Sequence, residues 1–316
     1  MTAALKPWKT IDEQLEILRS RGLQVEDTDR AKRYLLRLGY YRLSGYWYPF
    51  RQLLPENERQ GMELRCDHFM EGSRFDDLIT LYVFDKKLRL LALDALERIE
   101  MALRVDIAHL LGKKDPLAHE KPACFHGKFG KRVNHRFGKT DHQRWLEKYQ
   151  QQVSRAKNTA FVSHHLEKYG NLPIWVAIEV WDFGMLSTLF AGMKQADKNS
   201  LAQKYGASCG IELAEWLRSL NFIRNVSAHH ARLWNVNVVE RSSLPQGLYW
   251  QQLNNARPFF YFCLMQKFLQ VVCPTSSWGQ RLKALIDADF PAVDCGAIKS
   301  ADLGLIENWE SWELWT

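Results

Sequence analysis

The chain has 316 residues, of which 46% are apolar and 25% charged, a balance typical of a globular protein with a substantial core. It contains no apolar run of about 18 residues, and its N-terminal stretch lacks the apolar segment of a secretory signal, so we expect neither a membrane span nor a membrane partner. Six scattered cysteines without a C-x-x-C pair indicate reduced thiols and predict a cytoplasmic location.

The net charge of +7 is unevenly distributed along the chain. Residues 284–316 contain seven acidic residues and one lysine, so the 283 residues before them carry a net charge of +13. A basic surface of this kind favours a polyanion such as RNA. A basic surface that serves only solubility is the alternative.

Residues 1–75 predict a small N-terminal helical module. The segments IDEQLEILRSRGL and DTDRAKRYLLRLG have the periodicity of amphipathic helices. Asp27 or Thr28 is the expected N-cap of the second helix, and Gly39 is its expected end.

The stretch LGYYRLSGYWYPFR, residues 38–51, is unusually aromatic. Rings with arginines nearby can stack on unpaired bases, although aromatic residues at this density more often build a local core. The candidate RNA-binding residues here are Tyr40, Tyr41, Arg42, Tyr46, Trp47 and Arg51.

Residues 76–275 predict a larger all-α bundle. The expected helices are 93–112, 172–193, 210–230 and 256–272. Gly112 is the expected end of the first helix, and the second is apolar nearly all round, as a central buried helix would be. Residues 276–316 form an acidic tail with tryptophans at three-residue intervals.

Residues 113–144 interrupt the helical pattern and predict a basic loop insertion. They hold nine lysines and arginines against three acidic residues, and four histidines. The candidate RNA-binding residues are Lys128, Lys131, Arg132 and Arg136, which alternate with Phe125, Phe129 and Phe137. A solvated loop anchored by its phenylalanines is an equal alternative.

Metal-ligand residue types are present without the spacing of a metal site. Cysteine and histidine occur in CDH and CFH, and histidines are adjacent at 164–165 and 229–230. Adjacent histidines on a helix point about 100° apart and do not easily share one ion. We therefore expect no metal and no other cofactor.

The segment RNVSAHHARLWN, residues 224–235, contains an arginine followed by histidine after five and six residues. With 23 arginines and ten histidines in the chain, about two pairs at spacings of four to six residues are expected by chance and four occur. The spacing alone therefore indicates nothing. Its position after an amphipathic helix is more informative, because Asn225 and His229 would share one helix face and Asn225 could orient the imidazole.

Arg224 lies about 140° around an ideal helix from His229. The two side chains meet only if the arginine wraps around the helix, the helix is distorted, or two subunits meet at a two-fold axis, which favours a homodimer. An imidazole can take the 2′-hydroxyl proton of RNA while an arginine holds the phosphate. The alternative is a helix end whose histidine caps the last carbonyls.

Four ordered blocks resemble those of the bacterial Abi-like family (abortive infection, AbiD/AbiF type). They are LGYYRLSGYWYPFR, LYVFDKKLRLLALDALERIEMALR, LPIWVAIEVWDFGMLSTLF and WLRSLNFIRNVSAHHARLWN. The resemblance implies a HEPN-like helical domain that commonly dimerises and often cleaves RNA through an R-[N/H/D]-x-x-x-H site. Arg224, Asn225 and His229 match that pattern, and His230 matches a doubled histidine of the family.

The same resemblance places Glu97, Arg98, Glu100 and Arg104 at polar positions of a neighbouring helix, where they line the same cleft or form an internal ion-pair network. It implies phage defence through RNA metabolism, and for some members control by a small structured RNA.

The resulting hypothesis is a metal-independent endoribonuclease toxin that acts through Arg224, Asn225, His229 and His230. One rival is a non-catalytic RNA-binding or regulatory protein with a HEPN-like fold. Another is a regulatory protein whose tryptophan-containing tail docks onto a partner.

Overall fold

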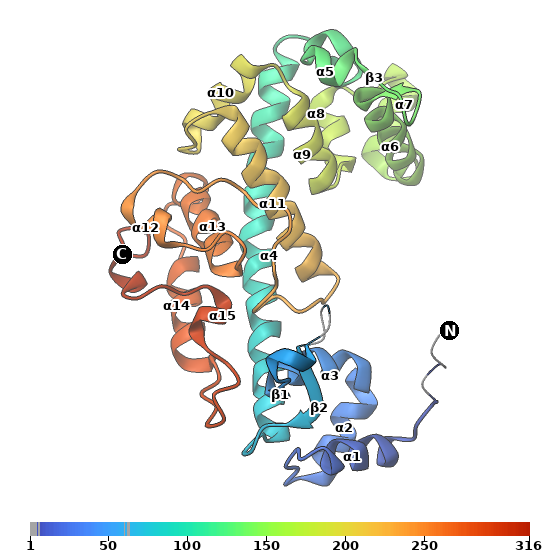
Figure 1. Ribbon diagram of the computed structural model, residues 1–316. Coiled ribbons are helices and arrows are strands. Elements are labelled where there is room, and N and C mark those ends of the chain that lie inside the picture. The colour runs from blue at the N-terminus through green and yellow to red at the C-terminus, as the bar shows by residue number, and fades with distance from the viewer. Residues whose placement is uncertain (1–4, 6, 60, 62–63) are drawn as a thin grey trace.

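The computed structural model describes residues 5, 7–59, 61 and 64–316 and shows an all-α protein (Figure 1). In this part of the chain, 15 α-helices are accompanied by short 3₁₀ turns and two two-stranded antiparallel ribbons. The predicted all-α fold class is therefore confirmed, whereas the HEPN-like classification stays a prediction. No helix within the described ranges is long and apolar enough to cross a membrane.

Helix α4, Phe75–Gly112, is the spine of the molecule (Figure 1). Its 38 residues correspond to about 57 Å, so it begins well before the predicted start at residue 93 and ends at the predicted glycine. The carboxylates of Asp76 and Asp77 lie in its first turn, where they interact favourably with the positive end of the helix dipole. The other helices are arranged in three groups along this spine.

The N-terminal group lies at the lower end of α4 in Figure 1. Thr10 and Glu13 form a capping box at the start of α1, and the Asp27 side chain caps α2 by accepting a hydrogen bond from the Arg30 amide at 2.8 Å. Gly39, at φ +83°, ends α2 as predicted, and α3 follows it directly. The elements of this group are α1 (Ile11–Ser20), α2 (Thr28–Leu38), α3 (Tyr40–Trp47), β1 (Arg51–Leu53) and β2 (Arg65–Phe69).

The second group covers the opposite end of α4 (Figure 1). Where the sequence predicts a loop over residues 113–144, the structure contains a short helix and a ribbon, held by a cluster of buried aromatic side chains around His142. The elements are α5 (Gly127–Gly130), β3 (Val133–Asn134), β4 (Lys139–Thr140), α6 (Asp141–Ala156), α7 (Ala160–Tyr169), α8 (Ile174–Ala177) and α9 (Phe183–Gly192).

The single helix expected over 172–193 is wrong. Helix α8 ends at Ala177, a 3₁₀ turn follows, and α9 begins only at Phe183. The Asp182 side chain accepts a hydrogen bond from the Met185 amide at 2.7 Å and so caps α9. One buried helix and two buried helices separated by an N-cap have the same apolar content. The break between α8 and α9 was therefore visible in the sequence only as the aspartate that caps α9.

The third group includes the helix that carries the RNVSAHH segment. Helix α11 runs antiparallel to α4: Lys204, just before it, pairs with Asp106, and the segment after it reaches Asp85. Helices α13 and α14 pack on the other side of α4 (Figure 1). The elements are α10 (Gln195–Lys204), α11 (Gly210–Ala228), α12 (Leu248–Gln252), α13 (Pro258–Val272), α14 (Trp278–Asp289) and α15 (Ser300–Leu303).

The C-terminal tail is packed against the body of the protein. Trp309 and Trp315 contact the ring of Phe259, with centroid distances of 5.1 and 5.8 Å, and Trp312 stacks on Tyr249 at 5.3 Å. All three tryptophans are buried. This packing removes the basis for a tail whose tryptophans are free to dock onto a partner.

Candidate functional site

The Arg224–His230 segment lies at the C-terminal end of α11. The apolar face of this helix is fully buried, whereas Arg224 and Asn225 on another face are half-buried. The helix ends at Ala228, and both His229 and His230 are exposed. The sequence therefore places a polar pair on the last turn of a buried helix and two imidazoles just beyond it.

The helix end is closed by its own backbone. The His230 amide donates to the Ser227 carbonyl at 3.2 Å, and the Ala231 amide donates to the Val226 carbonyl at 3.0 Å. This is the hydrogen-bond pattern of a Schellman motif, and His230 occupies its left-handed position with φ +57°. Among the described residues, no hydrogen bond of the His229 or His230 side chain caps a carbonyl, so the capping alternative has no support.

Arg224 lines a cavity of about 480 Å³ against α4. Its Nη1 donates a hydrogen bond to Oδ1 of Asn225 at 3.3 Å. Within the described ranges no hydrogen bond joins the Asn225 side chain to His229. The expected orienting contact is therefore replaced by one in which Asn225 positions the guanidinium.

Glu100 and Arg104 line the same cavity from α4. They form an ion pair at 2.6 Å, and Arg104 also donates to the Trp181 carbonyl at 2.7 Å. Burial raises the pKa of Glu100, while the charges of Arg104 and then Arg224 oppose this rise. Glu100 and Arg104 therefore line the cavity beside Arg224, and they also form an ion pair with each other.

Arg98 does not join this cavity. Its guanidinium pairs with Asp94 at 2.7 Å and donates to the Ser276 hydroxyl at 2.6 Å, which ties α4 to the segment before α14. Glu97 is exposed on the rim of the cavity. Of the predicted supporting residues, Glu100 and Arg104 therefore lie beside the motif and Arg98 faces elsewhere.

A buried carboxylate holds the segment that follows the motif. Asp85 Oδ1 accepts hydrogen bonds from the amides of Leu233 and Trp234, at 3.0 and 2.7 Å. Its Oδ2 accepts from the Tyr46 hydroxyl at 2.6 Å and pairs with Arg89. Burial raises the pKa of Asp85, and Arg89 is the largest influence that lowers it. Sequence reasoning missed this network, although an Asp–Arg pair four residues apart in an apolar helix was a usable signal.

The N-terminal group also contacts the motif directly. Arg42 Nη1 donates to the His230 carbonyl at 2.8 Å, and Arg232 donates to the Gly45 carbonyl. Helix α3 therefore supports the loop that carries the two histidines.

The aromatic stretch is largely core. Tyr46 and Trp47 are 2% and 0% exposed, so their predicted stacking on RNA bases is wrong. Tyr40 is half-buried and meets the edge of Trp47, and Arg51 is engaged with Asp67 at 2.8 Å. Two candidates keep a free surface: Arg42 is exposed, and Tyr41 is 92% exposed.

The insertion keeps its four cationic candidates on the surface. Lys128, Lys131, Arg132 and Arg136 are all exposed. Phe125 and Phe129 are buried and anchor the segment, so neither ring is free to stack on a base. Phe137 remains partly exposed and lies 3.9 Å from the Arg144 guanidinium carbon.

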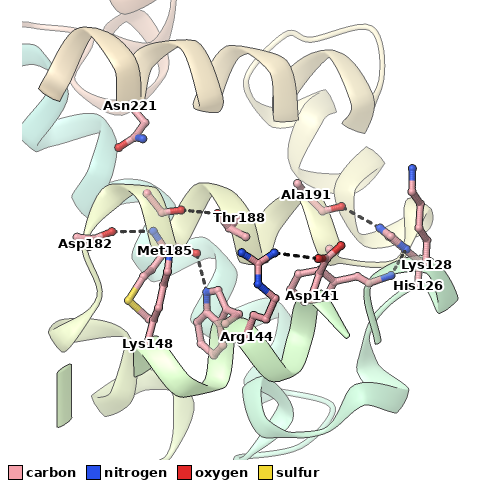
Figure 2. A pocket seen from close by; sticks show the side chains of 14 residues that line it. His126, Lys128, Asp141, Arg144, Lys148, Asp182, Met185, Thr188, Ala191 and Asn221 are labelled. Carbon is pink, nitrogen blue, oxygen red and sulfur yellow. Dashed lines mark hydrogen bonds and ion pairs between the residues drawn. The ribbon is translucent and has the colours of Figure 1, made fainter. Parts of the chain in front are cut away.

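A second cavity, of about 570 Å³, lies between α6 and α9 (Figure 2). Arg144 and Lys148 line it from α6, Lys128 from α5, and Asn221 from α11. Apart from Lys128, sequence reasoning named none of these residues, because no short motif connects them. Within the described residues, no group of three or more histidine, cysteine, aspartate or glutamate side chains is placed to hold a metal ion.

Comparison with known families gives one match. The family model described as Abi-like protein matches residues 33–235, which is more than half of the chain. The chain belongs to the Abi-like family. The match begins in α2 and ends just after the motif, so it includes every residue that lines the Arg224 cavity.

Family membership associates the Abi-like chain with abortive infection. No curated protein and no solved structure matches it. The site itself presents an anchored guanidinium and, at the end of the same helix, two exposed imidazoles that have no side-chain hydrogen bond to any residue the structure describes. Such groups can hold a phosphate and move a proton.

Proposed function

We propose that this Abi-like protein is a metal-independent endoribonuclease toxin of a bacterial abortive-infection system, with a HEPN-like domain. The proposal rests on one observation: Arg224 is held by Asn225 beside α4, while His229 and His230 stand exposed at the end of the same helix. A purely structural helix end needs neither a positioned guanidinium nor two free imidazoles.

The proposed reaction requires no metal or other cofactor. An imidazole accepts the proton of a ribose 2′-hydroxyl as its oxygen attacks the adjacent phosphorus, and the bond to the 5′-oxygen breaks. The leaving 5′-oxygen takes a proton from a second imidazole or from water. Arg224 stabilises the charge that grows on the phosphate. The products are a 2′,3′-cyclic phosphate and a 5′-hydroxyl.

The RNA would approach over the exposed cationic residues. Arg42 donates a hydrogen bond to the His230 carbonyl, Tyr41 precedes it on α3 as an exposed ring, and the insertion supplies further positive charge. The insertion residues in this proposal are Lys128, Lys131, Arg132 and Arg136. The partners are then a substrate RNA and a regulatory RNA, in the cytoplasm.

We further propose that the active form is a homodimer. Arg224 lines the cavity against α4, and among the described residues no histidine lines that cavity. Leu90, Met101 and Val105 leave 57%, 42% and 52% of their surface exposed, within about 60° around α4. This apolar strip suits contact with a second copy, which would bring the arginine of one chain to the histidine of the other.

The dimer is tested by mixing two inactive variants, Arg224→Ala and His229→Ala. A site shared between chains is intact once in each mixed dimer, so random mixing restores about a quarter of wild-type activity. Activity that stays absent after subunit exchange has been shown would contradict the shared site.

The function is tested by incubating the purified protein with RNA in EDTA. We expect His229→Ala to lower the cleavage rate about 10²–10⁴-fold and Arg224→Ala about 10²–10³-fold, with RNA binding retained. Matched controls are His164→Ala, from the other histidine pair, and Arg218→Ala, an exposed arginine of α11.

Two results would contradict the proposal. Cleavage that persists in both motif variants would place the activity elsewhere. RNA that is bound but cut by none of the proteins, together with expression that is not toxic, would favour the non-catalytic RNA-binding alternative.

A further inference from the structure

The cavity between α6 and α9 has the size and walls of a ligand site. Its volume of about 570 Å³ lies within the usual range for pockets that enclose small ligands. Figure 2 shows the side chains of α6 and α9 that line the cavity, and Asn221 projecting toward them from α11.

The rim of the cavity is cationic. Lys128 and Lys148 are exposed, and neither has an ion pair among the described residues. Arg144 stacks on Phe137 and lies 3.6 Å from Asp141. Two ammonium groups without an ion-pair partner in the described part of the chain lie beside one cavity, which favours binding of an anion there. Phosphate is an anion that lysines commonly bind.

The acidic and imidazole groups of the cavity already have partners. Asp182 is occupied as the N-cap of α9. Each ring nitrogen of His126 has a backbone partner: Nδ1 accepts from the Phe129 amide at 3.1 Å, and Nε2 lies 3.2 Å from the Ala191 carbonyl oxygen. These groups therefore build the wall, and the lysines remain free for a ligand.

The floor of the cavity is lined by short side chains and is partly apolar. Gly184, Thr188 and Ala191 follow one another at four- and three-residue intervals along α9, so one face of that helix presents short side chains. Met185 and Trp145 add apolar surface. A flat ring can lie on such a floor while its phosphate remains at the cationic rim.

The cavity is adjacent to the motif. Asn221 precedes Arg224 and Asn225 by three and four residues on the same face of α11, a rise of about 5 Å. The Trp181 carbonyl accepts a hydrogen bond from Arg104, which lines the Arg224 cavity, and the next residue, Asp182, lines this one. Both cavities therefore lie along one edge of α11.

We propose that the α6–α9 cavity is a subsite for one nucleotide of single-stranded RNA next to the bond that is cut. Lys128 and Lys148 bind the phosphate of this nucleotide, and its base or ribose lies on the face of α9. Asn221 lines the end of the subsite that is nearest to the motif, on the same helix. This inference rests on the proposed ribonuclease function.

The subsite is tested by the binding of a short, labelled, fully 2′-fluoro single-stranded oligonucleotide, which the proposed reaction cannot cut. We expect Lys128→Ala and Lys148→Ala each to weaken binding about fivefold, and the double variant about 20-fold. If both lysines contact phosphates, the salt dependence of log K loses about 0.7 per contact. Lys157→Ala, an exposed lysine that lines a different cavity, is the matched control.

A second variant fills the cavity without changing its charge. Thr188 is exposed on α9, so we expect Thr188→Trp to fold as the wild type does, by circular dichroism, and to weaken binding at least fivefold. Affinity and salt dependence that are unchanged in the double lysine variant and in Thr188→Trp would overturn the subsite. Wild-type binding of a mononucleotide as tight as that of the oligonucleotide would also overturn it, in favour of a free nucleotide.

The two proposals fail differently. If the wild type cuts RNA and the cavity variants bind and cut as it does, the subsite is lost and the ribonuclease stands. If no protein cuts RNA but the cavity variants lose binding, the subsite stands as an RNA-binding site and the ribonuclease is lost.

Discussion

The Arg224–Asn225 contact is the structural feature that most directly shapes the site. A guanidinium on a half-buried helix face has several accessible rotamers, and the hydrogen bond from Nη1 to Asn225 Oδ1 at 3.3 Å selects among them. Asn225 is therefore a positioning residue in the proposed mechanism and does not touch the RNA.

Asn225→Ala should lower kcat about tenfold with little change in KM, because the guanidinium loses its position in the transition state and the RNA-binding surface is intact. Asn225→Asp keeps an acceptor oxygen and should restore most of the rate. Steady-state cleavage of a short RNA measures both effects. Equal loss in the two variants would show that the acceptor oxygen is not what matters.

At this scale the sequence predicted identities better than contacts. Pattern and position predict Arg224, Asn225 and His229 as site residues, which stays a prediction, whereas Glu100 and Arg104 do lie beside Arg224. The partner of Asn225 was not predictable, because sharing a helix face with His229 does not determine which neighbouring donor the Asn225 side chain accepts from. The fate of Tyr46 and Trp47 depended on burial, which composition does not determine.

The end of α11 has a strained backbone conformation at His230 and carries two exposed imidazole side chains. His230 occupies the left-handed position of the Schellman motif at φ +57°, where glycine is the preferred residue. A histidine there costs about 1 kcal/mol relative to glycine. Residues that retain such a cost are often functional.

His230→Gly should therefore raise the free energy of unfolding by about 1 kcal/mol while it reduces RNA cleavage. Urea denaturation and the cleavage assay measure the two effects on one protein. His230→Ala, which keeps the left-handed strain and removes the imidazole, is the control and should reduce cleavage without the gain in stability. A loss of stability in His230→Gly would contradict the assigned helix end.

At the scale of elements, periodicity predicted α11 and α13 closely, but it predicted only the second half of α4 and did not predict the 16-residue α6. It failed where one residue interrupts an apolar run, as Asp182 does before α9, and where helical turns are too short to show a period, as in residues 113–144.

The whole molecule is organised by α4, which contacts each of the three groups of helices. Asp85 accepts a hydrogen bond from Tyr46 of the N-terminal group, and Arg89 donates one to the motif segment. Arg104 donates a hydrogen bond to the segment before α9, and Arg98 donates one to the segment before α14. The hydrogen bond between Arg42 and the His230 carbonyl joins residues 188 positions apart. No local pattern predicts such contacts, so the setting of the motif emerged only from the folded chain.

A buried histidine links global stability to pH. His119 is fully buried against Tyr149 and Trp181, and burial, followed by the charge of His142, lowers its pKa to about 4. The unfolded chain binds a proton below about pH 6.5 whereas the native protein does not until about pH 4. The free energy of unfolding should therefore fall by up to about 3 kcal/mol between these values.

The measurement is urea unfolding at pH 7.5, 6.0 and 4.5. His119→Phe keeps the ring contacts without a titrating group and should lose much of the decline in stability as pH falls. His164→Phe, at an exposed position, should keep the full wild-type decline. A wild-type pH dependence in His119→Phe would show that another group causes the acid sensitivity.

The central claim is that the motif of α11 cuts RNA through the ribose 2′-hydroxyl. The most direct measurement compares two oligonucleotides that differ only by one 2′-deoxyribose at the position that the wild type cuts, with EDTA present. The account predicts cleavage of the all-ribose oligonucleotide to a 2′,3′-cyclic phosphate and a 5′-hydroxyl, and protection of the deoxy position at unchanged affinity. Cleavage at the deoxy position would contradict it.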